Sequence, residues 1–414
     1  MKFSPILSKE KKSEYFLGLD IGSEAVKSLI FQRTIAEKGK IEKMIIWGRA
    51  LEYFDKSNIL NSQNLEENTV KNTVFGSVNG AYQNFIQNLG HKSNIRLNNL
   101  PALVNLAPDI LREEVITKSL ERESGDNVIS RKEEQEIREL ILKDIERKIE
   151  ERFSHDFGIT SEDIQFISFK SLETKIDGYN VLKLEGFKGK KLDFRLITVF
   201  ALKKYLKNIE KILKDLKLNF LRFLSKEENI NQFFIKESKE LAFLDVGGEI
   251  SQVFLIKNGK TEAIFEFESG GLDFTERLSQ VLGLNLGDAR NLKHNYSNHV
   301  LSEEVRKKVR EILSEENRNW FSCFKKGLRM LLGQQKRLLP SDIFISGGGS
   351  LLPEIKEILE EGNWEELPIV SKPGVKLIFP TDFKNIEDMT KGLLSVQDVS
   401  LILACLPSNR GISL

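Results

Sequence analysis

The chain twice places a strand of apolar residues before an acidic glycine turn and then resumes as a second strand. The first copy reads FLGLDIGSEAVKSLIF over residues 16–31, and the second reads LAFLDVGGEISQVFLIKNGK over residues 241–260. In both arms the apolar residues alternate or run together, which is typical of strands buried on one or both faces. A repeated supersecondary unit determines the architecture of a chain. The pattern therefore predicts two similarly folded halves.

The two turns correspond at three positions, and the second copy continues into a further hairpin. The matched pairs are Asp20 with Asp245, Gly22 with Gly247, and Glu24 with Glu249. After the second copy, Asn258-Gly259 makes a two-residue turn, which predicts another strand over residues 261–267. A single Asp-x-Gly turn is ordinary turn chemistry, because both residues favour turns. Two of them at the heads of two half-chains favour a shared function instead.

A third glycine turn joins an apolar strand to a helix near the end of the chain. The strand covers residues 343–345, and Gly347 to Gly349 follow it. The helix is predicted over residues 353–361, because Pro353 is favourable in a first helical turn. Glycine lets a backbone approach a flat ring or a phosphate closely. Backbone N–H groups and a carboxylate at such sheet edges commonly hold phosphate and its metal ion, so the three turns are our candidate site.

The middle of the chain has a different pattern. Residues 129–152 place apolar residues at helical spacing among dense charge, which predicts an amphipathic helix. The strands predicted after it cover residues 164–172, 179–184 and 192–200. One helix followed by a small antiparallel sheet indicates a module inserted into the first lobe. Elsewhere we predict helices over residues 201–217 and 302–339, and a loop over the Asn- and Ser-rich residues 55–75.

The composition limits the fold and the partners. With 414 residues the chain exceeds one typical core, so two lobes are expected. Basic and acidic residues number 62 and 61, which removes any general charge argument for nucleic acid or an anionic membrane as the main partner. Cys323 and Cys405 are the only cysteines, so we expect no disulfide framework. No apolar run suits a signal peptide or a membrane span, and we expect a cytoplasmic protein.

In this order, the three turns resemble the phosphate 1, phosphate 2 and adenosine motifs of actin-like ATPases, the superfold of actin, hexokinase and the heat-shock chaperones. Within it, the chain resembles the bacterial family of FtsA, which acts in cell division, and PilM, which acts in type IV pilus assembly. Further matches are ESGGLDFT at residues 268–275, DARNLK at residues 288–293, and the glycine turns between residues 175 and 192.

The resemblance implies an α/β, two-lobed actin-like ATPase fold of duplicated ribonuclease H-like halves. It also implies an inserted strand-helix-strand-strand subdomain in place of the usual small subdomain of actin. Each lobe would then contribute one acidic turn. The expected ranges are 1–98 for the N-terminal part of the first lobe, 99–198 for the insertion, 199–240 for the return helices, and 241–414 for the second lobe, with a helical subdomain at about 274–338.

The resemblance further implies ATP and Mg²⁺ as cofactors, and it gives each matched residue a role. Asp20 and Asp245 would face Mg²⁺ through water, and Lys27 would reach the terminal phosphates, where a positive charge offsets negative charge. Lys293 would lie near the nucleoside. The structural alternatives are an edge-strand charge for Lys27 and a solvated helix face for Lys293. The expected nucleotide-binding residues are Asp20, Gly22, Ser23, Lys27, Asp245, Gly247, Gly248, Gly270, Gly271, Lys293, Gly347, Gly348 and Gly349.

Two positions depart from the family pattern. Where the family has Asp-hydrophobic-Gly-Gly-Gly-Thr-Thr-Asp, residues 245–252 read DVGGEISQ. Glu249 thereby places a carboxylate where a glycine would admit phosphate, and its charge opposes binding unless it turns away from the cleft. Arg290 stands where the family has a glutamate that contacts the nucleoside. We therefore expect nucleotide binding rather than efficient hydrolysis, and we assign no catalytic residue.

Several classes of function share this fold. We favour a nucleotide-controlled cytoskeletal adaptor like FtsA, which self-associates into filaments and binds the tail of a division protein. The alternative is a PilM-like component of pilus assembly, which binds the cytoplasmic tail of an inner-membrane pilus protein. The chain end LPSNRGISL favours this alternative, because it lacks the amphipathic membrane helix typical of FtsA. A sugar or acid kinase would need a base that no sequence feature identifies, and a pseudo-ATPase scaffold would use its cleft for structure alone.

Both adaptor hypotheses place the protein at the cytoplasmic face of the inner membrane, where its membrane association would be indirect. Phe3, Ile6 and Leu7, which lie among lysines, are a candidate substitute anchor. We expect self-association and a peptide partner. The balanced charge leads us to expect no nucleic-acid partner.

Overall fold

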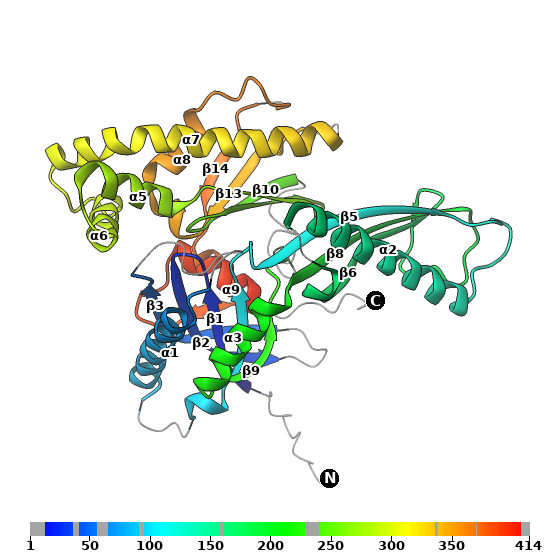
Figure 1. Ribbon diagram of the computed structural model, residues 1–414, viewed down its shortest axis with the longest axis horizontal. Helices are drawn as coiled ribbons and strands as arrows, with labels where there is room; N and C mark the ends of the chain where they lie inside the picture. Colours follow the sequence, from blue (N-terminus) through cyan, green and yellow to red (C-terminus); the bar gives the residue numbers. More distant parts are fainter. Residues whose placement is uncertain are drawn as a thin grey trace, which may run out of the picture.

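Two lobes and a smaller third body are each built on a β-sheet of their own (Figure 1). Each sheet has a separate cluster of buried hydrophobic residues against it. In Figure 1 the first lobe lies at the lower left, the second lobe lies above it, and the third body extends to the right. The computed structural model describes residues 13–35, 41–55, 65–90, 95–157, 160–227, 230, 240–335, 338–369 and 371–406.

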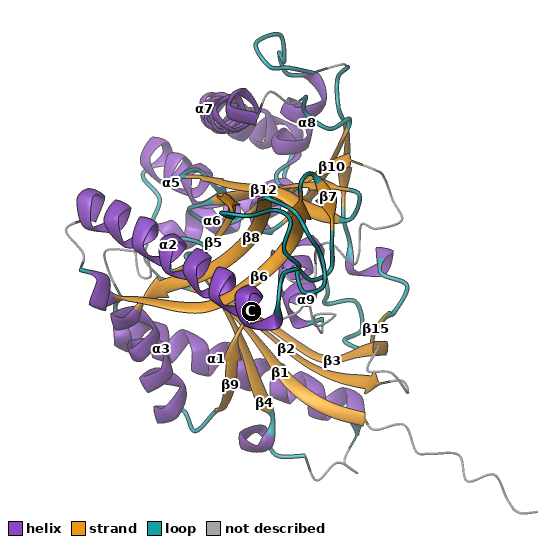
Figure 2. Ribbon diagram, turned by 90° about the vertical axis from the view of Figure 1, so that its right-hand side faces the viewer, coloured by secondary structure: helices purple, strands orange, loops and turns teal. Residues whose placement is uncertain are grey.

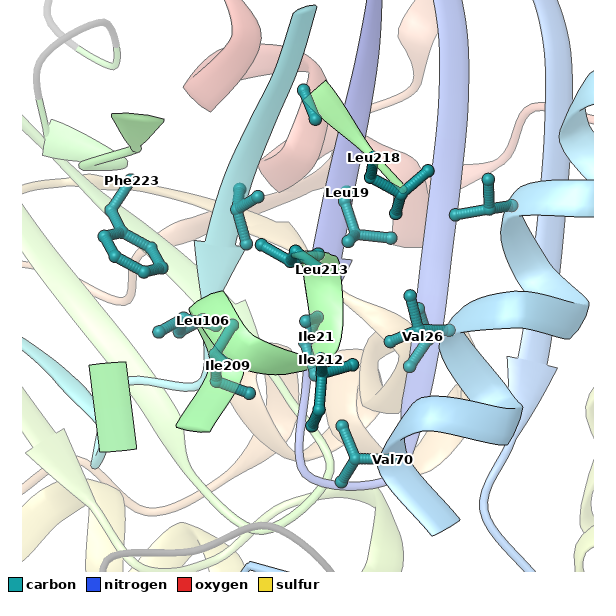
Figure 3. Packing of buried hydrophobic residues seen from close by; sticks show 14 of the residues in the cluster. Leu19, Ile21, Val26, Val70, Leu106, Ile209, Ile212, Leu213, Leu218 and Phe223 are labelled. Atoms are coloured by element: carbon teal, nitrogen blue, oxygen red, sulfur yellow. The ribbon is translucent and has the colours of Figure 1, made fainter. Parts of the chain in front are cut away.

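The first sheet is covered on one face by α1 (Glu67–Leu89) and α3 (Lys203–Asp215). Its strands β1 and β2 are the antiparallel arms of the first acidic turn, and β4 and β9 continue the sheet parallel to β1. Figure 3 shows part of its core, to which β1 contributes Leu19 and Ile21 and the helices contribute Val70 and Ile212. In pairing order the strands are β15 (Ile386–Asp388), β3 (Ile41–Tyr53), β2 (Ala25–Ile35), β1 (Ser13–Ile21), β4 (Pro101–Leu106) and β9 (Asn219–Phe223).

The second sheet repeats this arrangement. Its strands β10, β11 and β12 form consecutive hairpins, and β13 and β14 lie parallel to β10. The order therefore matches β3-β2-β1-β4-β9 of the first sheet, which confirms the duplicated halves predicted from the two acidic turns. In pairing order the strands are β12 (Lys260–Phe267), β11 (Ser251–Lys257), β10 (Glu240–Val246), β13 (Asp342–Ser346) and β14 (Gly374–Leu377).

Helices cover the second sheet and share its core. At its centre is Trp320, which stacks on Phe324 with ring centroids 5.7 Å apart and donates from Nε1 to the Ser251 hydroxyl at 3.1 Å. That bond satisfies the indole N–H, which a buried tryptophan needs. Helix α8, which the sequence predicts over residues 353–361 after the third turn, has those bounds. The helices are α5 (Gly271–Leu282), α6 (Leu286–Ser297), α7 (Glu303–Gln335) and α8 (Pro353–Glu361).

Helix α9 (Val399–Cys405) lies between the two large sheets (Figure 2). Its residues are all buried, which is typical of a helix that is apolar on every side. Leu401 and Ile402 pack with Phe31 of the first lobe, whereas Leu403 packs with Phe243 of the second. The helix therefore joins the two lobes through apolar contacts.

The third body is the strand-helix-strand-strand insertion that the sequence predicts. Its helix α2 (Arg131–Phe157) packs on the sheet through Ile137, Ile141, Ile145 and Ile149, which share one face because they are four residues apart. The long strands β5 and β6 flank β8, and β7 is a short edge strand. In chain order the strands are β5 (Leu111–Glu121), β6 (Ile164–Ile176), β7 (Tyr179–Asn180) and β8 (Lys191–Leu202).

Some segments differ from the sequence expectations. Strand β4 lies in the range 99–198 expected for the insertion, yet it pairs with β1, so the sheet of the insertion begins at β5. Strand β15 lies in the range 241–414 of the second lobe, yet it pairs with β3 of the first. The loop prediction is wrong for residues 67–75, which begin α1.

Short 3₁₀ helices complete the described secondary structure. They are Leu97–Asn99, Ser161–Asp163, Gly348–Leu351, Pro380–Asp382 and Val396–Asp398.

The described residues bear on the expectations about a membrane span and an N-terminal anchor. Across the described ranges, every helix is too short or too polar to traverse a bilayer. The candidate anchor residues Phe3, Ile6 and Leu7 and the terminal residues 407–414 lie outside these ranges.

Candidate functional site

The three glycine turns lie together in a cleft between the lobes. The β1–β2 turn comes from the first lobe, and the turns after β10 and β13 come from the second. The space open to water-sized groups is about 80 Å³, whereas pockets for ligands of drug size have roughly 300–1,000 Å³. A nucleotide therefore fits only if the lobes move apart. The expected site residues that line the cleft are Asp20, Gly22, Ser23, Lys27, Asp245, Gly247, Gly248, Lys293, Gly347 and Gly348.

The duplicated topology explains why the two aspartates face one cleft. Asp20 lies near the end of β1, opposite Asn105 of β4, and Asp245 lies near the end of β10, opposite Ser346 of β13. In both sheets the aspartate is thus on the first strand, next to a parallel neighbour. Ligands bind where parallel strands end at their carboxyl edge, and the two edges meet in this cleft.

Gly270, Gly271 and Gly349 lie behind the lining rather than in it. The N–H of Gly271 donates to the carbonyl oxygen of Gly247 at 2.8 Å. A Cβ on Gly270 would lie 2.3 Å from the carbonyl oxygen of Gly248, and one on Gly349 would lie 3.2 Å from the nitrogen of Gly271. These glycines let the start of α5 pack against the second acidic turn. These three glycines therefore support the second acidic turn from behind and do not line the cleft themselves.

Asp20 is held by two donors from the first lobe. Lys27 Nζ donates to Oδ2 at 2.7 Å, and Asn105 Nδ2 donates to Oδ1 at 2.6 Å. Burial alone would raise the pKa of Asp20, but the ammonium groups of Lys27 and Lys226 outweigh it and lower that pKa. Lys27 lies on β2, which is paired on both sides, so the edge-strand alternative is wrong. Its head group faces the cleft, as the resemblance implies.

Lys226 is a cleft residue that our sequence reasoning missed. Its Nζ donates to Asp245 Oδ2 at 2.7 Å, and the residue is buried. Burial would lower the pKa of Lys226, but Asp245 and Asp20 outweigh burial and raise it. The signal that points to Lys226 is its place: it follows β9, a parallel strand of the first sheet, at the carboxyl edge where ligands bind.

The carboxylates do not fit the Mg²⁺ that we expected between them. Asp20 and Asp245 each already accept a hydrogen bond from a lysine ammonium group. A magnesium ion needs oxygen ligands and their water shell, and it competes poorly for carboxylates that are neutralised in place. Among the residues that the structure describes, no group of three or more His, Cys, Asp or Glu side chains is arranged to hold a metal ion.

The two acidic turns touch each other across the cleft. The backbone N–H of Glu249 donates to the hydroxyl of Ser23 at 3.0 Å. A Cβ on Gly248 would lie 2.7 Å from the Cβ of Glu24, so glycine is needed for this approach. The residues that line the cleft include Gly248 but not Glu249. The Glu249 carboxylate therefore does not form part of the cleft wall where phosphate would bind. The N–H of Gly22 is used within its own turn, where it donates to the carbonyl oxygen of Ala25 at 3.0 Å.

Arg290 bridges the lobes at the rim of the cleft. Its Nε donates to Glu24 Oε1 at 3.0 Å, and its Nη2 donates to the carbonyl oxygen of Phe54 at 3.2 Å. The guanidinium also lies 4.6 Å from the ring centroid of Tyr53. Arg290 comes from α6 of the second lobe, whereas the groups it contacts come from the first lobe. This departure from the family pattern therefore closes the two lobes on each other.

Lys293 lies one turn further along α6 and is also buried, so the solvated helix face considered for it is wrong. Its Nζ donates to the carbonyl oxygen of Gly271 at 2.6 Å and lies 3.7 Å from Glu24 Oε1. Burial lowers the pKa of Lys293; Glu24 opposes this effect, and Arg290 adds to it. The ammonium group reaches the cleft, where the resemblance places the nucleoside.

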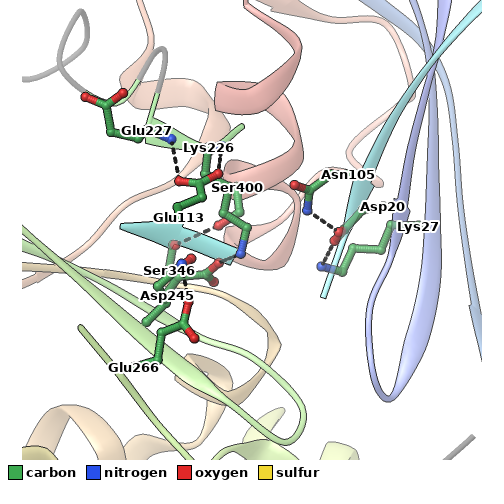
Figure 4. A network of polar contacts seen from close by, with 11 residues as sticks. Asp20, Lys27, Asn105, Glu113, Lys226, Glu227, Asp245, Glu266, Ser346 and Ser400 are labelled. Carbon is green, nitrogen blue, oxygen red and sulfur yellow. Dashed lines mark hydrogen bonds and ion pairs between the residues drawn. The ribbon is translucent and has the colours of Figure 1, made fainter. Parts of the chain in front are cut away.

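An acidic cluster lies next to the cleft, where the insertion meets both lobes (Figure 4). Glu113 of β5 accepts from the backbone nitrogens of Lys226 at 2.7 Å and Glu227 at 3.2 Å. Burial, reinforced by the charge of Glu227, raises the pKa of Glu113 to about 7. Burial also raises the pKa of Glu266 to about 8; Arg112 opposes the shift and Glu113 adds to it. At neutral pH Glu266 is therefore mostly protonated, whereas Glu113 is partly protonated.

The raised pKa of Glu113 predicts a pH-dependent stability. Unfolded, this carboxyl releases its proton near pH 4.5, whereas in the folded protein it keeps the proton to about pH 7. Its contribution to the free energy of unfolding is thus fully present below about pH 4.5 and is lost as the pH rises through about 7, a change of about 3 kcal/mol. In urea unfolding at several pH values, Glu113→Gln is expected to lose this fall. The exposed Glu121→Gln on the same strand should keep it, and equal profiles for the two variants would refute the prediction.

The fold is similar to that of known structures. No protein-family model matches the sequence, and no curated protein matches it significantly. A chain of the PilM–PilN type IV pilus biogenesis complex has a TM-score of 0.60 and 12% sequence identity, over 94% of this chain and 97% of that chain. The diol dehydratase-reactivating factor in its nucleotide-free form has a TM-score of 0.45 and 10% identity, over 95% and 99% of the two chains. The ethanolamine utilization protein EutJ from Carboxydothermus hydrogenoformans has a TM-score of 0.42 and 11% identity, over 87% and 85%.

The similarity to the chain of the PilM–PilN complex and the duplicated sheets agree on one architecture. The protein has the actin-like ATPase fold, with two ribonuclease H-like lobes and an inserted strand-helix-strand-strand subdomain. The resemblance of the sequence to the family that includes PilM is thereby confirmed at the level of the fold. At 12% identity this likeness shows the fold, and the function depends on the residues of the cleft.

Proposed function

We propose that this protein binds ATP between its two lobes and acts as an assembly adaptor like PilM, binding the cytoplasmic segment of an inner-membrane pilus protein. The observation that carries the proposal is the convergence of three turns from duplicated lobes on one cleft that Lys27 and Lys293 enter. The likeness to a chain of the PilM–PilN complex supports the choice of adaptor. Self-association and a place at the cytoplasmic face of the inner membrane belong to the same proposal.

The contact between the acidic turns indicates how ATP would control the lobes. In the closed cleft the Ser23 hydroxyl and the Glu249 N–H satisfy each other. When the lobes part, both groups become available to phosphate oxygens, and a bound phosphate would bridge the turns that now touch. The third turn leaves room for a ligand, because a Cβ on Gly348 would meet only Gln397 Oε1, at 3.9 Å. ATP binding would therefore set the distance between the lobes.

Replacing Lys27 tests the proposed nucleotide site. Lys27→Gln is expected to raise the dissociation constant for ATP at least about tenfold, because a charge-assisted bond to phosphate is lost. The measurement is isothermal titration of the full chain with ATP. The matched control is Lys71→Gln, which removes a lysine of α1 that is paired with Asp215. This variant should bind ATP with the affinity of the wild type. Equal affinities for the two variants would contradict the assignment of Lys27.

The adaptor function needs a separate test. A synthetic peptide with the cytoplasmic segment of the PilN-type protein of the same organism should bind the full chain, and its affinity should change when ATP is present. Light scattering measures whether the same conditions produce self-association. A tail peptide of the division protein serves as the competing probe, because the division hypothesis predicts that it binds instead. Sugar-dependent turnover of ATP would favour the kinase alternative over either adaptor.

A further inference from the structure

We propose that Lys226 takes the place of a divalent cation between the two acidic turns, so that this cleft binds its nucleotide without Mg²⁺. The inference rests on the nucleotide binding proposed above and names the ion requirement of the same site. It starts from the disagreement between the Mg²⁺ that the fold implies and the charges that occupy the cleft.

Two ammonium groups already neutralise the two carboxylates. Lys226 Nζ lies 2.7 Å from Asp245 Oδ2, and Lys27 Nζ lies 2.7 Å from Asp20 Oδ2 (Figure 4). Lys226 and the two aspartates line the same cleft. The ammonium group of Lys226 therefore supplies positive charge between the lobes, where a divalent cation would otherwise balance the carboxylates.

The charge balance matches that of a metal ion. Two carboxylates carry two negative charges, and Mg²⁺ or a pair of lysines supplies two positive charges. Without nucleotide, adding Mg²⁺ while both lysines stay in place would leave two excess positive charges in a buried cleft, where Coulomb repulsion is only weakly screened. The phosphates of a bound nucleotide add negative charge, which the ammonium groups of the cleft offset in place of the cation.

Lys226 is held in place and is not a mobile surface lysine. Its backbone nitrogen donates to Glu113 Oε1 at 2.7 Å, and the whole residue is only 8% exposed. Asp245 itself is only 5% exposed. Both oxygens of Asp20 accept hydrogen bonds. These contacts leave little of either carboxylate for the water shell of a metal ion.

The test compares ATP binding with Mg²⁺ and with EDTA. For the wild type we expect the dissociation constant to differ by less than about threefold between the two buffers, because fixed ammonium groups serve the phosphates in both. Lys226→Gln is expected to bind at least about tenfold more weakly in EDTA and to recover affinity when Mg²⁺ is added. Lys226→Arg keeps the charge and should remain independent of Mg²⁺. Lys71→Gln is the control for loss of a distant lysine.

A second measurement does not depend on nucleotide. Titration with Mn²⁺, followed by electron paramagnetic resonance, should show no tight site on the wild type and one on Lys226→Gln, because Asp245 then loses its ammonium partner and is open to a metal ion, whereas Asp20 keeps Lys27. Wild-type ATP binding that requires Mg²⁺, or a tight Mn²⁺ site on the wild type, would overturn the inference and leave the proposed function standing. No ATP binding in either buffer would overturn the proposed function instead, while the Mn²⁺ result still decides on Lys226. If Lys226→Gln does not fold, the wild type and Lys226→Arg supply the same decisions.

Discussion

Gly347→Ala is expected to lower the free energy of unfolding by about 3–5 kcal/mol, whereas Gly348→Ala is expected to change it by less than about 1 kcal/mol. Gly347 has φ +92° and ψ 165°, a region that only glycine adopts without strain. A Cβ there would also lie 2.3 Å from the carbonyl oxygen of Val246. At Gly348 a Cβ would have ordinary contact distances. Urea unfolding followed by circular dichroism measures the difference.

The same pair of variants separates fold from ligand binding. Gly348→Ala adds a methyl group to the cleft lining without a clash, so the protein should stay folded. If the proposed nucleotide passes over this turn, its dissociation constant should rise at least about threefold. Equal stability losses for the two glycines would contradict the geometry of the turn. Unchanged ATP affinity in folded Gly348→Ala would move the ligand away from it.

The strands and turns of both lobes could be predicted because their signals are local. Apolar alternation and turn residues are read within a few positions, and the second copy confirmed the first. The helix α1 was missed because residues 67–75 contain Asn and Thr, which have low helix propensity. The helix forms because Val70, Val74 and Val78 lie on one face that packs into the core of the first lobe. Tertiary packing overrides propensity there.

The contacts that close the cleft could not be predicted, because they join residues that are distant in sequence. Lys226 meets Asp245 only after β9 is placed beside β4, and Glu113 reaches Lys226 only after the insertion folds. The same reason hides β15, which returns from the second half of the chain to pair with β3. The three turns thus locate the site, whereas the ion pairs that set its chemistry depend on the whole fold.

Arg290→Met is expected to lower the free energy of unfolding by about 2–3 kcal/mol, because the mostly buried carboxylate of Glu24 loses its hydrogen-bonded partner and keeps the more distant Lys293, 3.7 Å away. Arg277→Met is the matched control: it breaks an exposed pair with Glu315 and should cost less than about 1 kcal/mol. The double variant Glu24→Gln/Arg290→Met should recover part of the loss, since the carboxylate that lost its hydrogen-bonded partner is then neutral. Urea unfolding measures all three.

Removing Arg290 should also open the cleft, because this side chain is a direct bond between the lobes. If the lobes separate more readily, the nucleotide site is open in a larger fraction of molecules. The apparent affinity for ATP and the association rate then both rise with that fraction. In stopped-flow experiments with a fluorescent ATP analogue, Arg290→Met should associate at least about threefold faster than the wild type. Arg277→Met should associate at the wild-type rate. If both variants behaved alike, the closing role of Arg290 would be refuted, and the narrow cleft would have to be held shut by the contact of the two acidic turns alone.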